Sequence, residues 1–153
     1  MTFKDTIAAL AQKIGVEIDI EDDACALKAQ ATDGTSVTIW MQGYDERGAV
    51  LTGADLGAPP PERLERLYRA MLEGNDLFRD TGGATLSIDP GTGHVRLQRF
   101  DSLDALEEVG PDKAFTAFAD VAAAWSKAIN DFRDAPQEDE NAADIGNFSA
   151  FKV

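Results

Sequence analysis

The side chains most able to do chemistry near neutral pH are one histidine, His94, and one cysteine, Cys25. A nucleophilic Cys25 would need a neighbouring base to form its thiolate, and His94 lies far from it in the sequence. Metal sites mostly combine several histidine or cysteine ligands, which this sequence does not offer. The pattern favours a surface histidine and a small buried cysteine, and we predict no catalytic residue and no metal site.

Two further stretches have compositions found at ligand sites. The acidic stretch 17–23 lacks the loop glycine and the closing bidentate glutamate of a calcium-binding EF-hand. The stretch 89–93, with two glycines, joins two predicted strands, so it lacks the helix N-terminus that binds phosphate. We interpret them as an exposed segment and a hairpin loop, and predict no cofactor. An enzyme with a hidden carboxylate site remains one alternative, although no acidic pair stands out as an acid beside a base.

The charge balance narrows the classes of partner. The 153 residues carry 28 acidic and 14 basic side chains, a net charge of −14. Such a surface repels nucleic acid and anionic membranes, although acidity also occurs for solubility alone.

No apolar run reaches the length of about 18 residues that suggests a membrane span, and the first residues do not resemble a secretory signal. With its lone cysteine, the chain is expected to be cytoplasmic.

The apolar spacing predicts the elements that would position any site. Positions 3–14 have helical spacing, and period-two alternation marks strands at 25–29, 37–41 and 49–56. A second helix, 64–72, ends at Gly74-Asn75, and a hairpin of 84–88 with 95–97 precedes a long aromatic-striped helix, 111–132. We therefore predict an α+β domain over 1–134, an antiparallel sheet with helices in the order α-β-β-β-α-β-β-α. Residues 135–153 would form an acidic, mobile spacer with an apolar end.

Trp40 is the one aromatic residue that the alternation separates from the predicted core. It lies on the opposite strand face from Val37, Ile39 and Met41. Either this indole is exposed and marks a partner site, or a helix or a second subunit covers it.

The order of elements and one stretch of sequence resemble the class I type III secretion chaperones, also called the Tir-chaperone family. The stretch is Met71-Leu72-Glu73-Gly74-Asn75, followed by the glycine-started strand from Gly82 to Asp89 and then Val95-Arg96-Leu97. A leucine-ended helix with an asparagine, followed by such a strand, is similar to the family pattern across residues 3–132.

The resemblance implies a homodimer without enzymatic activity. It would bind the N-terminal region of a secreted effector, keep that region secretion-competent and prevent aggregation. The alternative is a small cytoplasmic regulatory or adaptor domain of the same fold that binds a folded partner. The implied site residues fall into two groups: Leu10, Ile14, Leu27, Ile39 and Trp40 for binding the partner, and Leu64, Leu67, Met71, Leu86 and Ile88 for the dimer interface.

The apolar end of the chain suggests one more hypothesis. Phe148, Phe151 and Val153 follow the acidic spacer and could occupy the chaperone's own effector groove until cargo arrives. The alternatives are a tail packed permanently on the core and a disordered tail.

Overall fold

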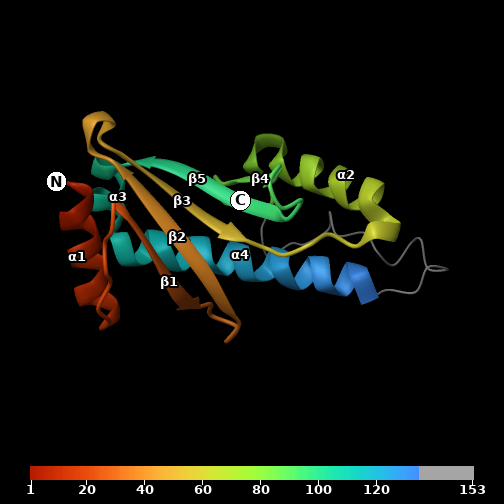
Figure 1. Cartoon of the computed structure of the whole chain (residues 1–153), viewed down its shortest axis with the longest axis horizontal. Helices are drawn as coiled ribbons and strands as arrows, with labels where there is room; N and C mark the ends of the chain where they lie inside the picture. Colours follow the sequence, from red (N-terminus) through yellow and green to blue (C-terminus); the bar gives the residue numbers. More distant parts are fainter. Residues whose placement is uncertain (135–153) are drawn as a thin grey trace.

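The computed structural model describes residues 1–134 as an α+β domain, which confirms the predicted fold class (Figure 1). Three short 3₁₀ turns lie at Asp45–Arg47, Pro61–Arg63 and Asp76–Phe78. The main elements are α1 (Phe3–Ile14), β1 (Ala24–Gln30), β2 (Ser36–Tyr44), β3 (Ala49–Asp55), α2 (Leu64–Asn75), β4 (Thr85–Ile88), β5 (Val95–Ser102), α3 (Leu103–Val109) and α4 (Pro111–Asp134).

Helix α3 was not predicted from the sequence. Its seven residues are too few to show a helical period, and only Leu103 and Leu106 are buried. The helix begins because the Ser102 hydroxyl accepts a hydrogen bond from the Ala105 N–H at 3.0 Å. Gly110 then separates α3 from Pro111 at the start of α4.

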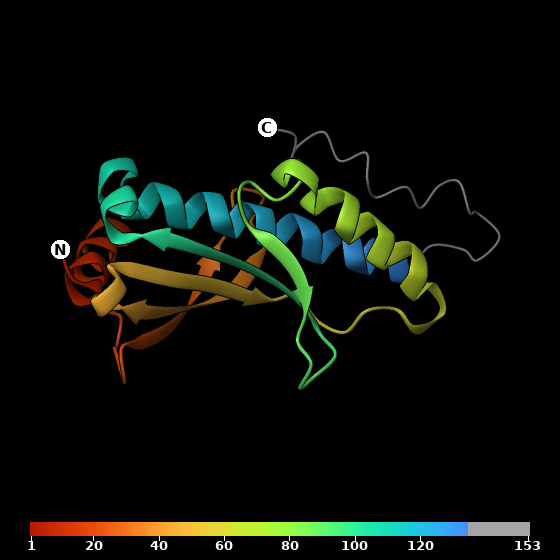
Figure 2. The same ribbon diagram turned by 90° about the horizontal axis from the view of Figure 1, so that it is seen from above.

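The five strands form one antiparallel sheet in the order β1-β2-β3-β5-β4. In Figure 2 the sheet lies on one side of α4, and its other face carries no helix of the described chain. The register places Cys25, Met41 and Thr52 in one row, facing the helices. Trp40 and Gly53 belong to the neighbouring row and face outward, as the alternation predicted.

The long helix α4 is the centre of the core. Its aromatic stripe is buried as predicted, against α1 and the helix-facing side of the sheet. The stripe consists of Phe115, Phe118, Ala122, Trp125, Ile129 and Phe132. Among residues 1–134, no helix combines the length and apolar character that crossing a bilayer requires.

The junction between α2 and β4 explains why glycine and asparagine end this helix. Gly74 is buried against the Trp125 indole, whose Nε1–H donates to the Asp80 carbonyl at 2.8 Å. The Asn75 side chain accepts from the Leu86 N–H at 2.8 Å and donates to the Leu86 carbonyl at 3.0 Å. The Asn75 amide therefore satisfies the N–H and the carbonyl of Leu86, the two backbone groups of this residue that point away from β5.

Replacing Gly74 by Ala should destabilise the domain. An added Cβ would lie 2.9 Å from Trp125 Cζ2, so the indole must shift within a packed core. Overpacking costs about 1–3 kcal/mol, and the better helix propensity of Ala returns at most about 1 kcal/mol. We expect a net loss of about 1–2 kcal/mol in the free energy of unfolding, measured in urea. Gly91→Ala is the control, because its Cβ would make only an ordinary contact at 3.4 Å. Equal stability of the two variants would contradict this reading.

Candidate interaction surfaces

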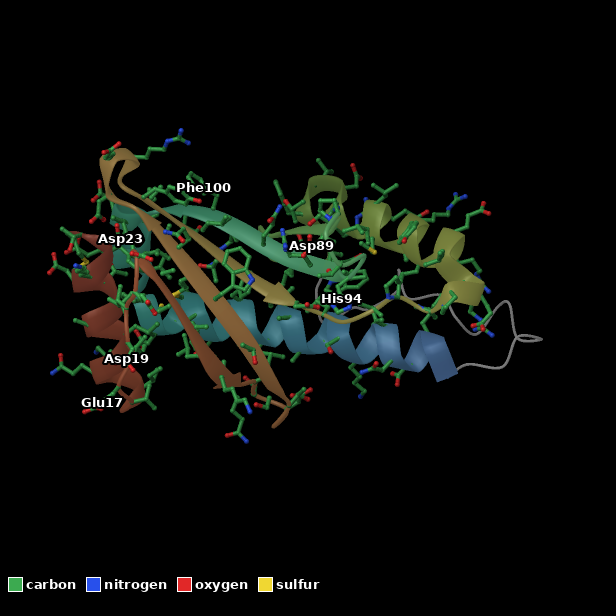
Figure 3. The ribbon with its side chains drawn as sticks, viewed as in Figure 1. Glu17, Asp19, Asp23, Asp89, His94 and Phe100 are labelled. Atoms are coloured by element: carbon green, nitrogen blue, oxygen red, sulfur yellow. The ribbon has the colours of Figure 1, made fainter. Side chains whose placement is uncertain are left out.

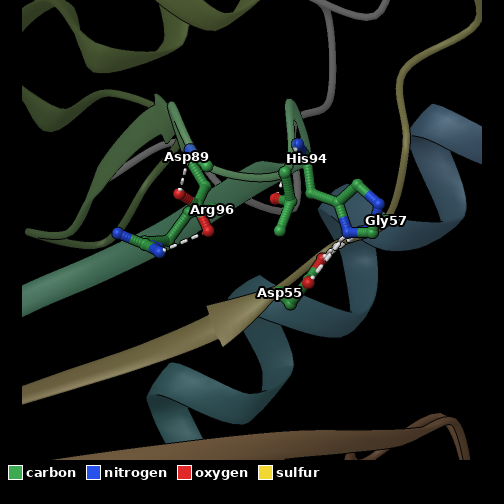
Figure 4. A network of polar contacts seen from close by, with 7 residues as sticks. Asp55, Gly57, Asp89, His94 and Arg96 are labelled. Carbon is green, nitrogen blue, oxygen red and sulfur yellow. Dashed lines mark hydrogen bonds and ion pairs between the residues drawn. The ribbon is translucent and has the colours of Figure 1, made fainter.

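His94 lies at the surface in a polar network beside the β4–β5 hairpin (Figure 4). Its Nδ1 is 2.9 Å from Asp55 Oδ2, and the Gly57 N–H donates to Asp55 Oδ1 at 2.8 Å. Partial burial works to raise the pKa of Asp55, but the hydrogen bonds from His94 and Gly57 outweigh it and hold this pKa below its ordinary value. Arg96 forms a separate ion pair with Asp89 at 2.8 Å. The His94–Asp55 contact joins the hairpin to the end of β3, and the Arg96–Asp89 pair links the two arms of the hairpin.

Cys25 is buried on the helix-facing side of β1, as predicted. Burial raises the pKa of its thiol to about 11. In the sheet, β2 and β3 lie between β1 and the strand that follows His94. The structure therefore gives Cys25 neither a base nor the environment of a nucleophile.

The buried thiol makes a measurable prediction. With a pKa near 11, Cys25 is almost entirely neutral at pH 8.5, whereas an exposed thiol is then about half ionised. We expect iodoacetamide to alkylate Cys25 at least a hundredfold more slowly in the native protein than in urea. The pKa of Cys25 is higher in the folded than in the unfolded protein. The contribution of its neutral thiol to folding stability is therefore complete below about pH 8.5 and is lost as the pH rises towards 11. Equal alkylation rates in the two states would show that the thiol is accessible.

The acidic stretch 17–23 forms the connection from α1 to β1. Figure 3 shows Glu17, Asp19 and Asp23 spread along this connection. Over the part of the chain that the structure describes, no three His, Cys, Asp or Glu side chains are grouped as metal ligands.

The residues predicted to bind the partner do not form one groove. Leu10 and Ile39 belong to the core, with exposed fractions of 1% and 0%, so the domain itself covers them. Ile14 and Leu27 are half-buried and pack against the same core. Trp40 lies on the opposite face of the sheet. Periodicity identified the apolar residues but not which of them the helices α1 and α4 cover.

Trp40 is half-buried on the outer face of the sheet. Its indole is therefore neither the fully exposed side chain nor the covered one that the sequence left open as alternatives. Its indole lies over Gly53, where an added Cβ would be 2.0 Å from Trp40 Cζ2. The Arg96 guanidinium lies over the ring, with its Cζ 5.9 Å from the ring centre, within cation–π range. Neighbours within the same sheet thus cover much of this indole.

The residues predicted for the dimer interface are also mostly internal. Leu67, Met71 and Leu86 are buried, while Leu64 and Ile88 are half-buried. The apolar stripe of α2 is broad, and its central residues contact the protein's own core. The exposed part lies at the edge of this stripe.

Exposed apolar residues follow along the chain from that edge, and the set Tyr68, Leu72, Leu77 and Phe78 is here called the α2 patch. The exposed fractions are 70% for Leu72, 84% for Leu77 and 50% for Phe78, and Tyr68 is half-buried. Leu77 and Phe78 have φ of 55° and 54°, a left-handed conformation that costs about 1–2 kcal/mol for each such residue. Strained and exposed apolar neighbours are typical of a surface that is buried in a complex. Periodicity could not predict this pair, because Leu77-Phe78 follows the end of the helix and belongs to no helical or strand period.

A second surface, here called the β5 groove, lies at the opposite end of α4. It has a volume of about 350 Å³ between β5, α3 and the start of α4, and Val109, which lines it, is 56% exposed. The exposed Phe100 ring points to the outer face of the sheet, where its centre lies 6.0 Å from that of the Tyr44 ring. β4 pairs with β5 only up to Gln98, so the edge of β5 from Arg99 to Ser102 has no strand partner on that side within residues 1–134. The groove is lined by Gly82, Gly83, Arg99, Phe100, Asp101, Ala105, Leu106, Val109, Lys113, Ala114 and Ala117.

The predicted self-occluding residues Phe148, Phe151 and Val153 lie outside the described residues, as does the whole spacer.

The comparisons with known proteins agree with this fold. The model of the Tir chaperone protein (CesT) family matches residues 5–126. No curated protein matches the sequence. Among solved structures, the HopA1–SchA chaperone–effector complex is similar with a TM-score of 0.60 at 14% identity, over 87% of this chain and 94% of that chain.

Two more complexes contain the same fold. The heterodimeric ExoU–SpcU complex from the type III secretion system of Pseudomonas aeruginosa has a TM-score of 0.55 at 20% identity, over 80% of this chain and 92% of that one. The ExsC–ExsE complex has a TM-score of 0.55 at 16% identity, over 84% and 96%. At these identities the likeness is one of fold.

Proposed function

This chain belongs to the Tir chaperone protein (CesT) family, and from that premise we propose that it is a type III secretion chaperone. It binds the N-terminal region of a secreted effector, keeps that region secretion-competent and prevents its aggregation. The similar folds in chaperone–effector complexes support this function. It acts in the cytoplasm, where cargo is held before export, and it makes or breaks no covalent bond.

The β5 groove offers an extended peptide the two kinds of contact it needs. The unpaired edge of β5 supplies main-chain hydrogen bonds, as in other cases of strand addition. Alternate side chains of the peptide would then enter the apolar space beside Leu106, Val109 and Ala117. We propose this groove as a cargo site, in place of the predicted one that included the buried Leu10 and Ile39.

The α2 patch is the proposed surface of a homodimer. A twofold interface uses the same surface on both subunits, so an exposed leucine of the patch is buried in each of the two subunits. Burying the patch would also offset the strain at Leu77 and Phe78. Leu64 and Ile88, the half-buried members of the predicted set, remain candidates for the edge of this interface.

The observation that carries the function is the family match over residues 5–126. Its test is co-expression with the reading frames beside the gene, followed by affinity purification and limited proteolysis. We expect one co-purified protein whose protected fragment comes from its N-terminal region. A protected fragment that is a folded domain would instead indicate the adaptor alternative, and no protected fragment from any neighbour would contradict the proposal.

A further inference from the structure

The α2 patch lies next to the point where the chain leaves the described domain. Arg63, just before α2, donates from Nη1 to the Phe132 carbonyl at 3.4 Å, and its guanidinium lies 5.6 Å from the centre of the Phe132 ring. The end of α4 is therefore beside the start of α2, as Figures 1 and 2 both show. Residues 135–153, here called the tail, begin at this place.

The tail and the surface around α2 have complementary charges. Positions 63–79 hold four arginines and three acidic residues, a net charge of +1 in a chain of net −14. The tail holds four acidic residues and one lysine, a net charge of −3. In the tail, the acidic residues come before the apolar residues Phe148 and Phe151. Positions 63–79 have the matching order, because three arginines, at 63, 66 and 69, come before Leu77 and Phe78.

Chain length favours the α2 patch over the β5 groove. Phe148 follows Asp134 by 14 residues, and a coil of that length spans about 20 Å. At 1.5 Å per residue, Leu72 lies about 14 Å along the chain direction of α2 from Arg63. The groove residue Ala117 lies about 26 Å back along α4 from Asp134, and Lys113 about 32 Å. The tail therefore reaches the patch without being stretched.

We propose that the tail binds the α2 patch of its own chain, with Phe148 and Phe151 covering Leu72, Leu77 and Phe78. The acidic spacer would run beside the arginines at the start of α2. A segment attached so close to its site has an effective concentration in the millimolar range. The tail then competes with a second copy of the chain for the same surface, and the monomer is favoured at low protein concentration.

Cross-linking in the full chain tests this contact directly. The double variant Leu72→Cys with Phe148→Cys is oxidised mildly at about 1 μM protein, and the product is sized under denaturing conditions. The native Cys25 does not compete, because it is buried and its pKa is raised to about 11. The control pair is Val109→Cys with Phe148→Cys, because Val109 lines the β5 groove.

We expect an intramolecular disulfide in the Leu72 pair to form at least tenfold faster than in the control pair. Equal rates would overturn the proposal, and a faster control pair would place the tail in the β5 groove. Disulfide-linked dimers alone would show that a second copy occupies the patch. Because the cross-link reports the contact itself, the result is independent of whether any effector binds.

A second variant set asks whether the contact controls association. Phe148→Ser with Phe151→Ser should remove the competitor and tighten self-association at least tenfold, measured by sedimentation. Glu138→Gln, Asp139→Asn and Glu140→Gln together should act in the same direction, with a smaller effect. Unchanged self-association in both sets would overturn the competitive role of the tail.

Discussion

Leu72→Asp should abolish the proposed homodimer and leave the fold intact. Leu72 makes little contact with its own domain, with 70% of its surface exposed, whereas a twofold interface would bury it on both subunits. Each buried leucine contributes about 1.5–3 kcal/mol, and an unpaired buried carboxylate costs more, so dimer affinity should fall by well over a hundredfold. Light scattering at tens of micromolar should show a monomer, while the melting temperature stays within about 2 °C of the parent.

Val16→Asp is the matched control for this experiment. Val16 is also an exposed apolar residue, but it follows α1, far in the sequence from the α2 patch. The Val16 variant should remain dimeric. If Leu72→Asp is as dimeric as Val16→Asp, the α2 patch is not the interface.

Placing a charge in the β5 groove should remove most effector binding. Val109→Asp and Ala117→Asp change two groove walls on different elements, and both residues are exposed, so the fold should tolerate either change. Each loses an apolar contact and places a carboxylate beside the peptide, for which we expect at least a thirtyfold weaker affinity. Calorimetric titration with the protected effector fragment gives the dissociation constant.

A variant of Trp40 distinguishes the β5 groove from the outer face of the sheet as the cargo site. Trp40→Ala changes the outer face of the sheet and leaves the groove residues untouched. If the cargo lies in the groove, affinity should respond to Val109 and Ala117 together and only weakly to Trp40. A loss with Trp40→Ala alone would move the cargo site to the outer face.

The fold was largely predictable because its signals are local. Helix α4 is long enough for its aromatic stripe to repeat over about five turns, and the strands alternate cleanly. The seven residues of α3 and the strained turn at Leu77-Phe78 show no such period, so neither was predicted. Both border the surfaces proposed for function.

The site residues were less predictable for a different reason. Periodicity shows that Leu10, Ile39, Leu67 and Met71 are apolar, but burial depends on which helix lies above each of them. Leu67 and Leu72 belong to the same apolar stripe of α2, yet one is buried against the domain and the other is exposed. Only the packing of α2 beside β4 and α4 separates the two.

The asparagine amide at the edge of β4 affects how copies of this chain can assemble. A head-to-tail filament built by sheet extension needs an open strand edge at each end of the sheet. At one end the Asn75 side chain already occupies both backbone groups of Leu86, in the middle of a four-residue strand. Endless polymerisation through the two outermost strands is thereby disfavoured, which suits a protein that must hold aggregation-prone chains without becoming a template for them.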